Sequence, residues 1–138
     1  MAASRESRPT PPATLAVVRL AILLGALAFG GVAWYVRRQP DWTASPAVND
    51  DAFFFATLGI WATATVGLMI LRTRWQRETD PARRTPLMIT GWALGEIPAL
   101  WGGVLYLLGA DPQRYLTGLL FLVMAFLLLP LRPARPRG

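Results

Sequence analysis

The stretch from Thr14 to Val36 reads TLAVVRLAILLGALAFGGVAWYV and carries a single charged residue, Arg19. A helix needs about 20 predominantly apolar residues to cross a hydrocarbon core of about 30 Å. Lipid offers no partners to backbone N–H and C=O groups, so a segment that crosses it must satisfy them internally, as a helix does. The stretch therefore predicts a transmembrane helix over about residues 14–36.

Three more apolar segments follow along the chain, at about residues 52–71, 87–109 and 113–131. Short stretches rich in Pro, Asp and Arg separate them, as is typical of turns and loops. With 54% hydrophobic residues in 138, the composition is that of a membrane protein rather than of a soluble domain. We expect an all-α polytopic protein, with residues 14–131 forming one domain of four transmembrane helices in an antiparallel bundle.

Both ends of the chain differ in composition from this domain. Residues 1–13 and 132–138 are rich in Pro and Arg, and we expect them to form disordered basic tails. A cleaved signal peptide is the alternative for the first segment, because small residues occur at Ala26–Ala28. The apolar run continues beyond that point through Trp34 and Tyr35, however, and is longer than the usual signal core. We therefore favour a retained helix.

The distribution of arginines predicts the orientation. All 14 basic residues are arginine, which in an Ala- and Leu-rich chain is typical of a GC-rich bacterial genome. If the N-terminus is inside, ten arginines lie on the inner side: Arg5, Arg8, Arg72, Arg74, Arg77, Arg83, Arg84, Arg132, Arg135 and Arg137. The outer loops then hold Arg37, Arg38 and Arg114. Since inner loops carry the excess of arginine, we expect both termini in the cytoplasm and a multi-pass location in a bacterial inner or plasma membrane.

The third segment carries small residues at every fourth position: Gly91, Gly95, Ala99 and Gly103. Residues four apart lie on the same helix face. Such a face lets another helix approach closely in lipid, where hydrophobic attraction between helices is lacking. This small-residue ridge either packs against another helix of the same chain or binds a partner subunit or a second copy. The spacing is the same in both cases.

Glu96 is the acid of this third segment and lies nine residues from its start. At about 1.5 Å per residue it is about 14 Å deep, close to the midplane. A charged side chain at that depth costs about 2.5–3.5 kcal/mol on insertion scales. We therefore expect a neutral carboxyl unless a partner compensates the charge.

Depth also identifies candidate partners for Glu96. Arg19 lies at about 8 Å and Thr63 at about 12 Å by the same helical rise. Arg19 either pairs with the acid or extends toward the cytoplasm, the direction in which its Cβ bond tilts. Pro98 leaves the carbonyl of Leu94 without its helical donor and favours a kink beside the acid. These residues form the candidate intramembrane polar site.

The sequence ALGEIPALWGGVLYLL, residues 93–108, resembles the carboxylate helix of the rotary ATP synthase c-subunit. RRQP at residues 37–40 is similar to the polar loop of that family. The resemblance implies that Glu96 is an ion-binding carboxylate. The whole chain is similar to small four-helix bacterial membrane proteins with one intramembrane acid, a resemblance that assigns no activity.

Catalysis is not expected. The chain has no Cys and no His, and its three serines, Ser4, Ser7 and Ser45, lie in tails or loops. Nothing forms a nucleophile–base pair or a metal site. We expect no enzyme activity, no metal and no cofactor. Nucleic-acid binding is not expected either, despite the formal charge of +6, because a basic patch needs a soluble face.

Two functional hypotheses remain. The first is a non-catalytic membrane protein, a structural, assembly or accessory subunit that packs through small-residue helix faces. Its partners would be the lipid bilayer and another membrane protein or a second copy. The alternative is a homo-oligomer that conducts protons or cations through the intramembrane carboxylate of Glu96.

Overall fold

The structure, a computed structural model, describes residues 11–131. Over this range it is all-α and has no strands. Its elements are α1 (Pro12–Arg37), the 3-10 helix η1 (Pro46–Asn49), α2 (Asp51–Arg77), α3 (Pro81–Leu108) and α4 (Pro112–Leu128). The expected tails lie outside the described residues, except that α1 already begins at Pro12 within the expected N-terminal tail.

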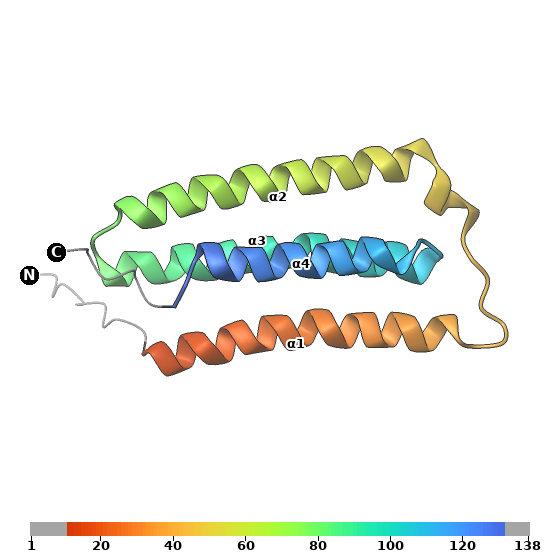
Figure 1. Ribbon diagram of the computed structural model, residues 1–138, viewed down its shortest axis with the longest axis horizontal. Coiled ribbons are helices and arrows are strands. Elements are labelled where there is room, and N and C mark those ends of the chain that lie inside the picture. The colour runs from red at the N-terminus through yellow and green to blue at the C-terminus, as the bar shows by residue number, and fades with distance from the viewer. Residues whose placement is uncertain (1–10, 132–138) are drawn as a thin grey trace, which may run out of the picture.

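The four long helices lie side by side, and successive helices run in opposite directions (Figure 1). α3 and α4 lie between α1 and α2 in this view. α3 contacts each of the other three helices and packs most extensively against α4. The start of α1, the α2–α3 connection and the end of α4 share one end of the molecule. We name this the arginine-rich end, because the arginines between residues 72 and 84 lie there.

Two of the helices are long and apolar enough to cross a membrane, α1 with 26 residues and α2 with 27. α3 has 28 residues but lacks a stretch that is apolar enough, because Glu96, Pro98 and several glycines interrupt it. α4 is apolar but has only 17 residues. The helices that meet both requirements are thus the two that are most exposed, whereas α3 is the helix that contacts all the others.

The α2–α3 connection is shorter than the loop we expected at residues 72–86. α2 continues to Arg77 and α3 begins at Pro81, so only residues 78–80 lie between them. The Asp80 carboxylate accepts a hydrogen bond from the Ala82 backbone N–H at 2.9 Å, and Pro81 occupies the first helical turn. Both features favour a helix start. Arginine and glutamine are also good helix formers, which explains the longer α2.

A tight turn reverses the chain between α3 and α4. Gly109 has a φ of 118°, which glycine adopts without a Cβ penalty. Its N–H donates to the Tyr106 carbonyl at 3.1 Å, and the Ala110 N–H donates to the Leu105 carbonyl at 2.9 Å. This pattern is a Schellman motif. It ends α3 and places α4 antiparallel beside it.

The core follows the α3–α4 contact. Trp92, Leu105, Leu122 and Leu129 are fully buried. The Trp92 indole N–H donates to the Leu129 carbonyl at 3.0 Å and so caps the end of α4. Among the described residues, none of the buried side chains is polar or charged in type. The outer faces of α1, α2 and α4 instead expose large apolar side chains, which is typical of a surface in contact with lipid.

Candidate functional site

The small-residue ridge of α3 is occupied within the chain. Gly91, Gly95, Ala99 and Gly103 are all buried. A Cβ on Gly95 would lie 2.5 Å from the Cβ of Ala125, and a Cβ on Gly103 would lie 2.6 Å from the ring of Phe29. The ridge therefore packs against α4, and at Gly103 also against α1. In the structure, the small-residue ridge packs against other helices of the same chain.

α4 and α1 complete this packing. Gly118 of α4 lies directly against the Pro98 carbonyl and the Ala99 Cα of α3. The Tyr115 hydroxyl donates to the Ala26 carbonyl of α1 at 2.7 Å. Its ring lies against Gly30, where a Cβ would clash with it. These close approaches require glycine and join three helices at one level.

Glu96 is half-buried and faces α1. Its Oε1 lies 3.5 Å from the position that a Cβ on Gly25 would occupy, which is ordinary van der Waals distance. Gly25 itself is exposed, so the carboxyl group lies at the edge of the α1–α3 interface. Over the part of the chain that the structure describes, Glu96 has no hydrogen-bond or ion-pair partner.

Arg19 was expected at a depth similar to that of Glu96, but its guanidinium group contacts aromatic rings instead. Its guanidinium carbon is 4.6 Å from the centre of the Phe126 ring and 6.0 Å from that of Trp92. A cation over an aromatic face is attracted by the ring quadrupole. Trp92 precedes Glu96 by one helical turn, so Arg19 lies on the arginine-rich side of the acid. The structure does not bring Arg19 and Glu96 together as an ion pair.

Thr63 is also separate from Glu96. It is exposed on α2 and lines a hollow of about 360 Å³ whose α3 wall is Leu94 and Ile97. α1 and α2 pack on opposite sides of α3 (Figure 1), and Glu96 faces α1. Pro98 is buried, and α3 continues through it from Pro81 to Leu108. Of the four candidate polar-site residues, Glu96 thus stands alone beside Gly25.

One cluster at the end opposite the arginine-rich end was not anticipated. The Arg37 guanidinium donates to the carbonyls of Ala110 at 2.9 Å and Tyr106 at 3.2 Å. It also stacks over the rings of Tyr106 at 4.3 Å and Trp42 at 5.0 Å. The Trp42 indole donates to the Leu107 carbonyl at 3.2 Å. Arg37 and Trp42 thus bind the Tyr106 and Leu107 carbonyls in the last turn of α3, and the Ser45 N–H donates to the Leu108 carbonyl at 2.8 Å.

This end is further fixed by an aromatic pair. Phe53 of α2 stacks on Trp101 of α3 with ring centres 6.0 Å apart. The Trp101 indole donates to the Thr57 hydroxyl at 2.9 Å. A signal for these contacts existed in the sequence, since Trp and Tyr gather near these segment ends, but their partners are set by packing.

The residues that the structure describes offer no cluster of metal ligands. Residues 11–131 contain no group of three or more acidic side chains that could hold a metal ion. Comparison with known proteins finds no family model, no curated protein and no solved structure that matches the chain.

Proposed function

We propose that this chain is an integral membrane protein that crosses the bilayer four times, as an antiparallel bundle with both termini in the cytoplasm. α1 and α2 support this by length and apolarity. α1 and α2 also turn large apolar side chains outward along their length, among them Leu24, Val66 and Ile70. In water such faces would be costly to expose.

α3 and α4 are also compatible with crossing the membrane. Among the residues that interrupt the apolar stretch of α3, Gly95 and Pro98 are buried against other helices and need not face lipid, whereas Glu96 is half-buried at the α1–α3 interface. α4 has 17 residues, which span about 25 Å at 1.5 Å per residue. The chain then continues through the apolar residues Leu129, Pro130 and Leu131. Neither helix is excluded from spanning.

The charges support the orientation. The arginine-rich end carries Arg72, Arg74, Arg77, Arg83 and Arg84, and inner loops hold the excess of arginine in membrane proteins. At the opposite end Arg37 is bound to the carbonyls of α3 and so has a structural role. This end would then face the outside of a bacterial inner or plasma membrane.

Within that membrane, we propose a non-catalytic role as a structural, assembly or accessory subunit. The observation that carries this proposal is Glu96, half-buried beside the exposed Gly25. An unpaired polar group in hydrocarbon costs free energy that a partner can offset. Since the α3 ridge is filled by α4, the partner, another membrane protein or a second copy, would contact the α1–α3 face around Glu96.

Purification in mild detergent tests this role. The expected result is that the full chain elutes with a second protein or as an oligomer. Glu96→Gln keeps hydrogen-bonding capacity and should retain the assembly, whereas Glu96→Leu should lose it. Gly31→Leu is the matched control, because Gly31 has open space around it on another face of α1. A monomer in all four samples would contradict the role.

Proton or cation conduction by a homo-oligomer is the alternative, and the same variants separate it. Conduction needs a titrating group, so Glu96→Gln should abolish flux into reconstituted vesicles. Neither Arg19 nor Thr63 forms an ion pair or hydrogen bond with Glu96, which lends this alternative no support. Equal flux for the wild type and Glu96→Gln would end it.

A further inference from the structure

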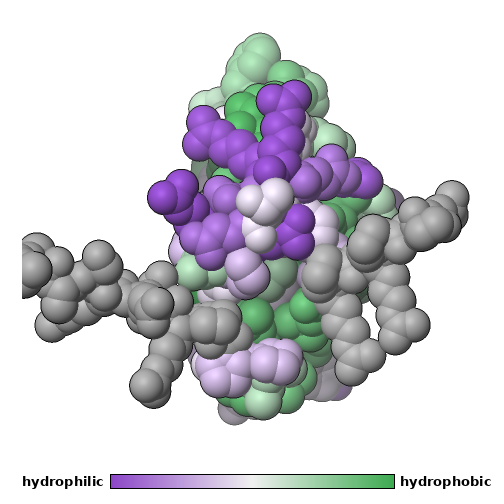
Figure 2. Space-filling view, turned by 90° about the vertical axis from the view of Figure 1, so that its left-hand side faces the viewer, coloured by the Kyte–Doolittle hydropathy of each residue, from purple (hydrophilic) through white to green (hydrophobic). Residues whose placement is uncertain are grey.

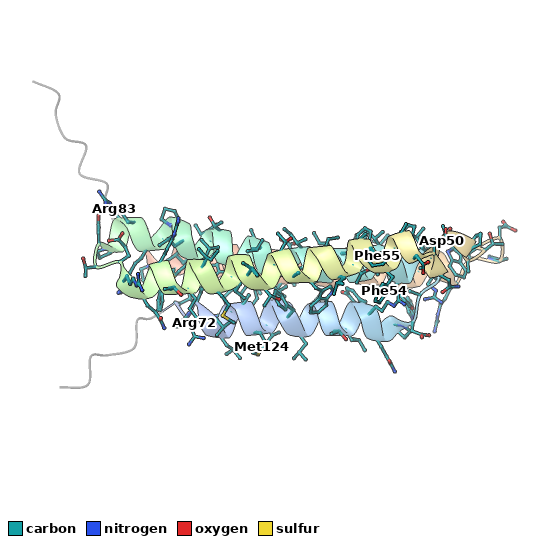
Figure 3. The ribbon with its side chains drawn as sticks, turned by 90° about the horizontal axis from the view of Figure 1, so that it is seen from above. Asp50, Phe54, Phe55, Arg72, Arg83 and Met124 are labelled. Atoms are coloured by element: carbon teal, nitrogen blue, oxygen red, sulfur yellow. The ribbon has the colours of Figure 1, made fainter. Side chains whose placement is uncertain are left out.

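A basic cleft lies at the arginine-rich end, where α2 meets α3. Arg74, Arg77 and Glu78 line it from the end of α2 and the connection, and Arg83 and Leu87 line it from α3, around a volume of about 380 Å³. Figure 2 faces this end and shows hydrophilic side chains gathered over the connection. Figure 3 shows Arg83 at this end of α3, whereas Arg72 lies on the other side of α2, toward α4, and does not line the cleft. The cleft is therefore built by two elements rather than by one run of charges.

The three arginines of this cleft are only partly offset by acids, since Glu78 lines the same cleft and Asp80 lies beside Arg83. Arg83 lies 3.7 Å from the Asp80 carboxylate, but both side chains are largely exposed, at 77% and 50%, so this pair contributes little. Arg74 and Arg77 form no ion pair within residues 11–131. The cleft thus keeps a net positive charge.

Arg84 is a neighbour with a different role. Its Nε donates to the Glu78 carbonyl, and its guanidinium carbon lies 5.4 Å from the centre of the Trp75 ring. These contacts hold the connection in place. Arg84 is therefore not one of the arginines that line the cleft.

An apolar furrow adjoins the cleft on the side away from the connection. Met69, Ile70 and Thr73 line it, together with the same Arg74 and Arg77, around a volume of about 360 Å³. Met69 and Ile70 are half exposed, at 48% and 50%. The cleft and the furrow share Arg74 and Arg77. Positive charge therefore lies next to the exposed apolar side chains of Met69 and Ile70.

We propose that the cleft and furrow bind an anionic phospholipid of the cytoplasmic leaflet. Its phosphate would lie among Arg74, Arg77 and Arg83, since the guanidinium fork matches phosphate geometry. An acyl chain would follow the furrow over Met69 and Ile70. Basic clusters just inside a membrane helix attract anionic lipids. A soluble phosphate would leave the furrow empty, which favours the lipid.

Native mass spectrometry of the full chain in mild detergent tests this proposal, which rests on the membrane location proposed above. Phosphatidylglycerol and phosphatidylcholine are added as an equimolar pair. We expect the wild type to retain phosphatidylglycerol in preference. Arg74→Gln combined with Arg77→Gln should weaken that preference about tenfold, because each arginine near the surface attracts the anionic lipid. Arg114→Gln removes an exposed arginine at the other end and should change nothing.

The proposal would be overturned by equal retention of the two lipids, by an unchanged preference in the double variant, or by an equal loss in Arg114→Gln. Displacement by millimolar glycerol phosphate alone would also contradict it, since the headgroup would then suffice. Helicity by circular dichroism verifies that the double variant folds. Cell fractionation separates the two failures: absence from the membrane pellet contradicts the proposed function, whereas presence there without a lipid preference contradicts only the lipid site.

Discussion

The Glu96 carboxyl group of α3 lies against Gly25 of α1, with its Oε1 3.5 Å from where a Cβ on residue 25 would be. Because Gly25 has no side chain, the carboxyl group is open on that side to whatever surrounds α1. The absence of a side chain at Gly25 thus makes the Glu96 carboxyl group accessible from the lipid in which we propose that the chain lies.

Because the carboxyl group is open on this side, we expect it to react with a reagent that dissolves in the membrane. A membrane-soluble carbodiimide, which reacts with protonated carboxyl groups, should modify Glu96 in native membranes. Gly25→Leu should slow the modification, because the added side chain covers the carboxyl group. The measurement is peptide mass spectrometry after timed labelling. Gly31→Leu, on open space elsewhere on α1, should react as the wild type does, and equal rates for both leucine variants would contradict the geometry.

The two neighbouring arginines at the end of α1 should differ in importance. Arg37→Gln removes hydrogen bonds to the Ala110 and Tyr106 carbonyls and should lower the free energy of unfolding by about 2 kcal/mol. Arg38 stacks only on the exposed Trp34, with 3.9 Å to the ring centre. Arg38→Gln should cost about 0.5 kcal/mol or less. Titration with dodecyl sulfate in mixed micelles measures both, and similar losses would argue against the Arg37 contacts.

Much of the fold could be predicted from the sequence, because apolar segments of about 20 residues leave few alternatives to helices. The all-α class with four long helices is confirmed. The α2–α3 connection was predicted too long, since arginines that look like a loop are good helix formers and Asp80 caps the next helix. Composition signals the apolar core of a helix better than its polar ends.

The contacts of the candidate site were less predictable. The sequence indicates the position of a residue along its helix, but the packing of the helices decides which neighbours it meets. Thr63 and Glu96 have similar expected depths, but Glu96 faces α1 whereas Thr63 lines a hollow between α2 and α3. Arg19 stacks on Phe126 of α4, a partner more than 100 residues away in the sequence. The occupant of the small-residue ridge could not be chosen from spacing alone for the same reason.

Glycines at helix contacts and glycines on open faces should respond oppositely to alanine. A Cβ on Gly118 would collide with the Pro98 carbonyl, a backbone atom that cannot turn away. Gly118→Ala should destabilise the fold by about 1–3 kcal/mol. Gly59 has nothing within 4 Å of the same position, so Gly59→Ala should stabilise α2 by about 0.5–1 kcal/mol. The same micelle titration compares them, and a neutral Gly118→Ala would disprove the close α3–α4 contact.

The hydroxyl of Tyr115 should contribute separately from its ring. Tyr115→Phe keeps the ring against Gly30 but removes the hydrogen bond to the Ala26 carbonyl. We expect a loss of about 1 kcal/mol in the free energy of unfolding. Tyr35→Phe is the control, since Tyr35 is 63% exposed and its hydroxyl donates to no residue in the described range. No difference between the two variants would mean that the bond does not form.

The membrane topology is tested most directly by single-cysteine accessibility, because the chain has no cysteine of its own. Thr43→Cys, Thr79→Cys and Glu96→Cys are each treated with a membrane-impermeant maleimide, in intact and then in permeabilised cells. We predict that residue 43 reacts in intact cells, residue 79 only after permeabilisation, and residue 96 in neither. Labelling of residue 96 by this reagent, or of residues 43 and 79 from the same side, would contradict it.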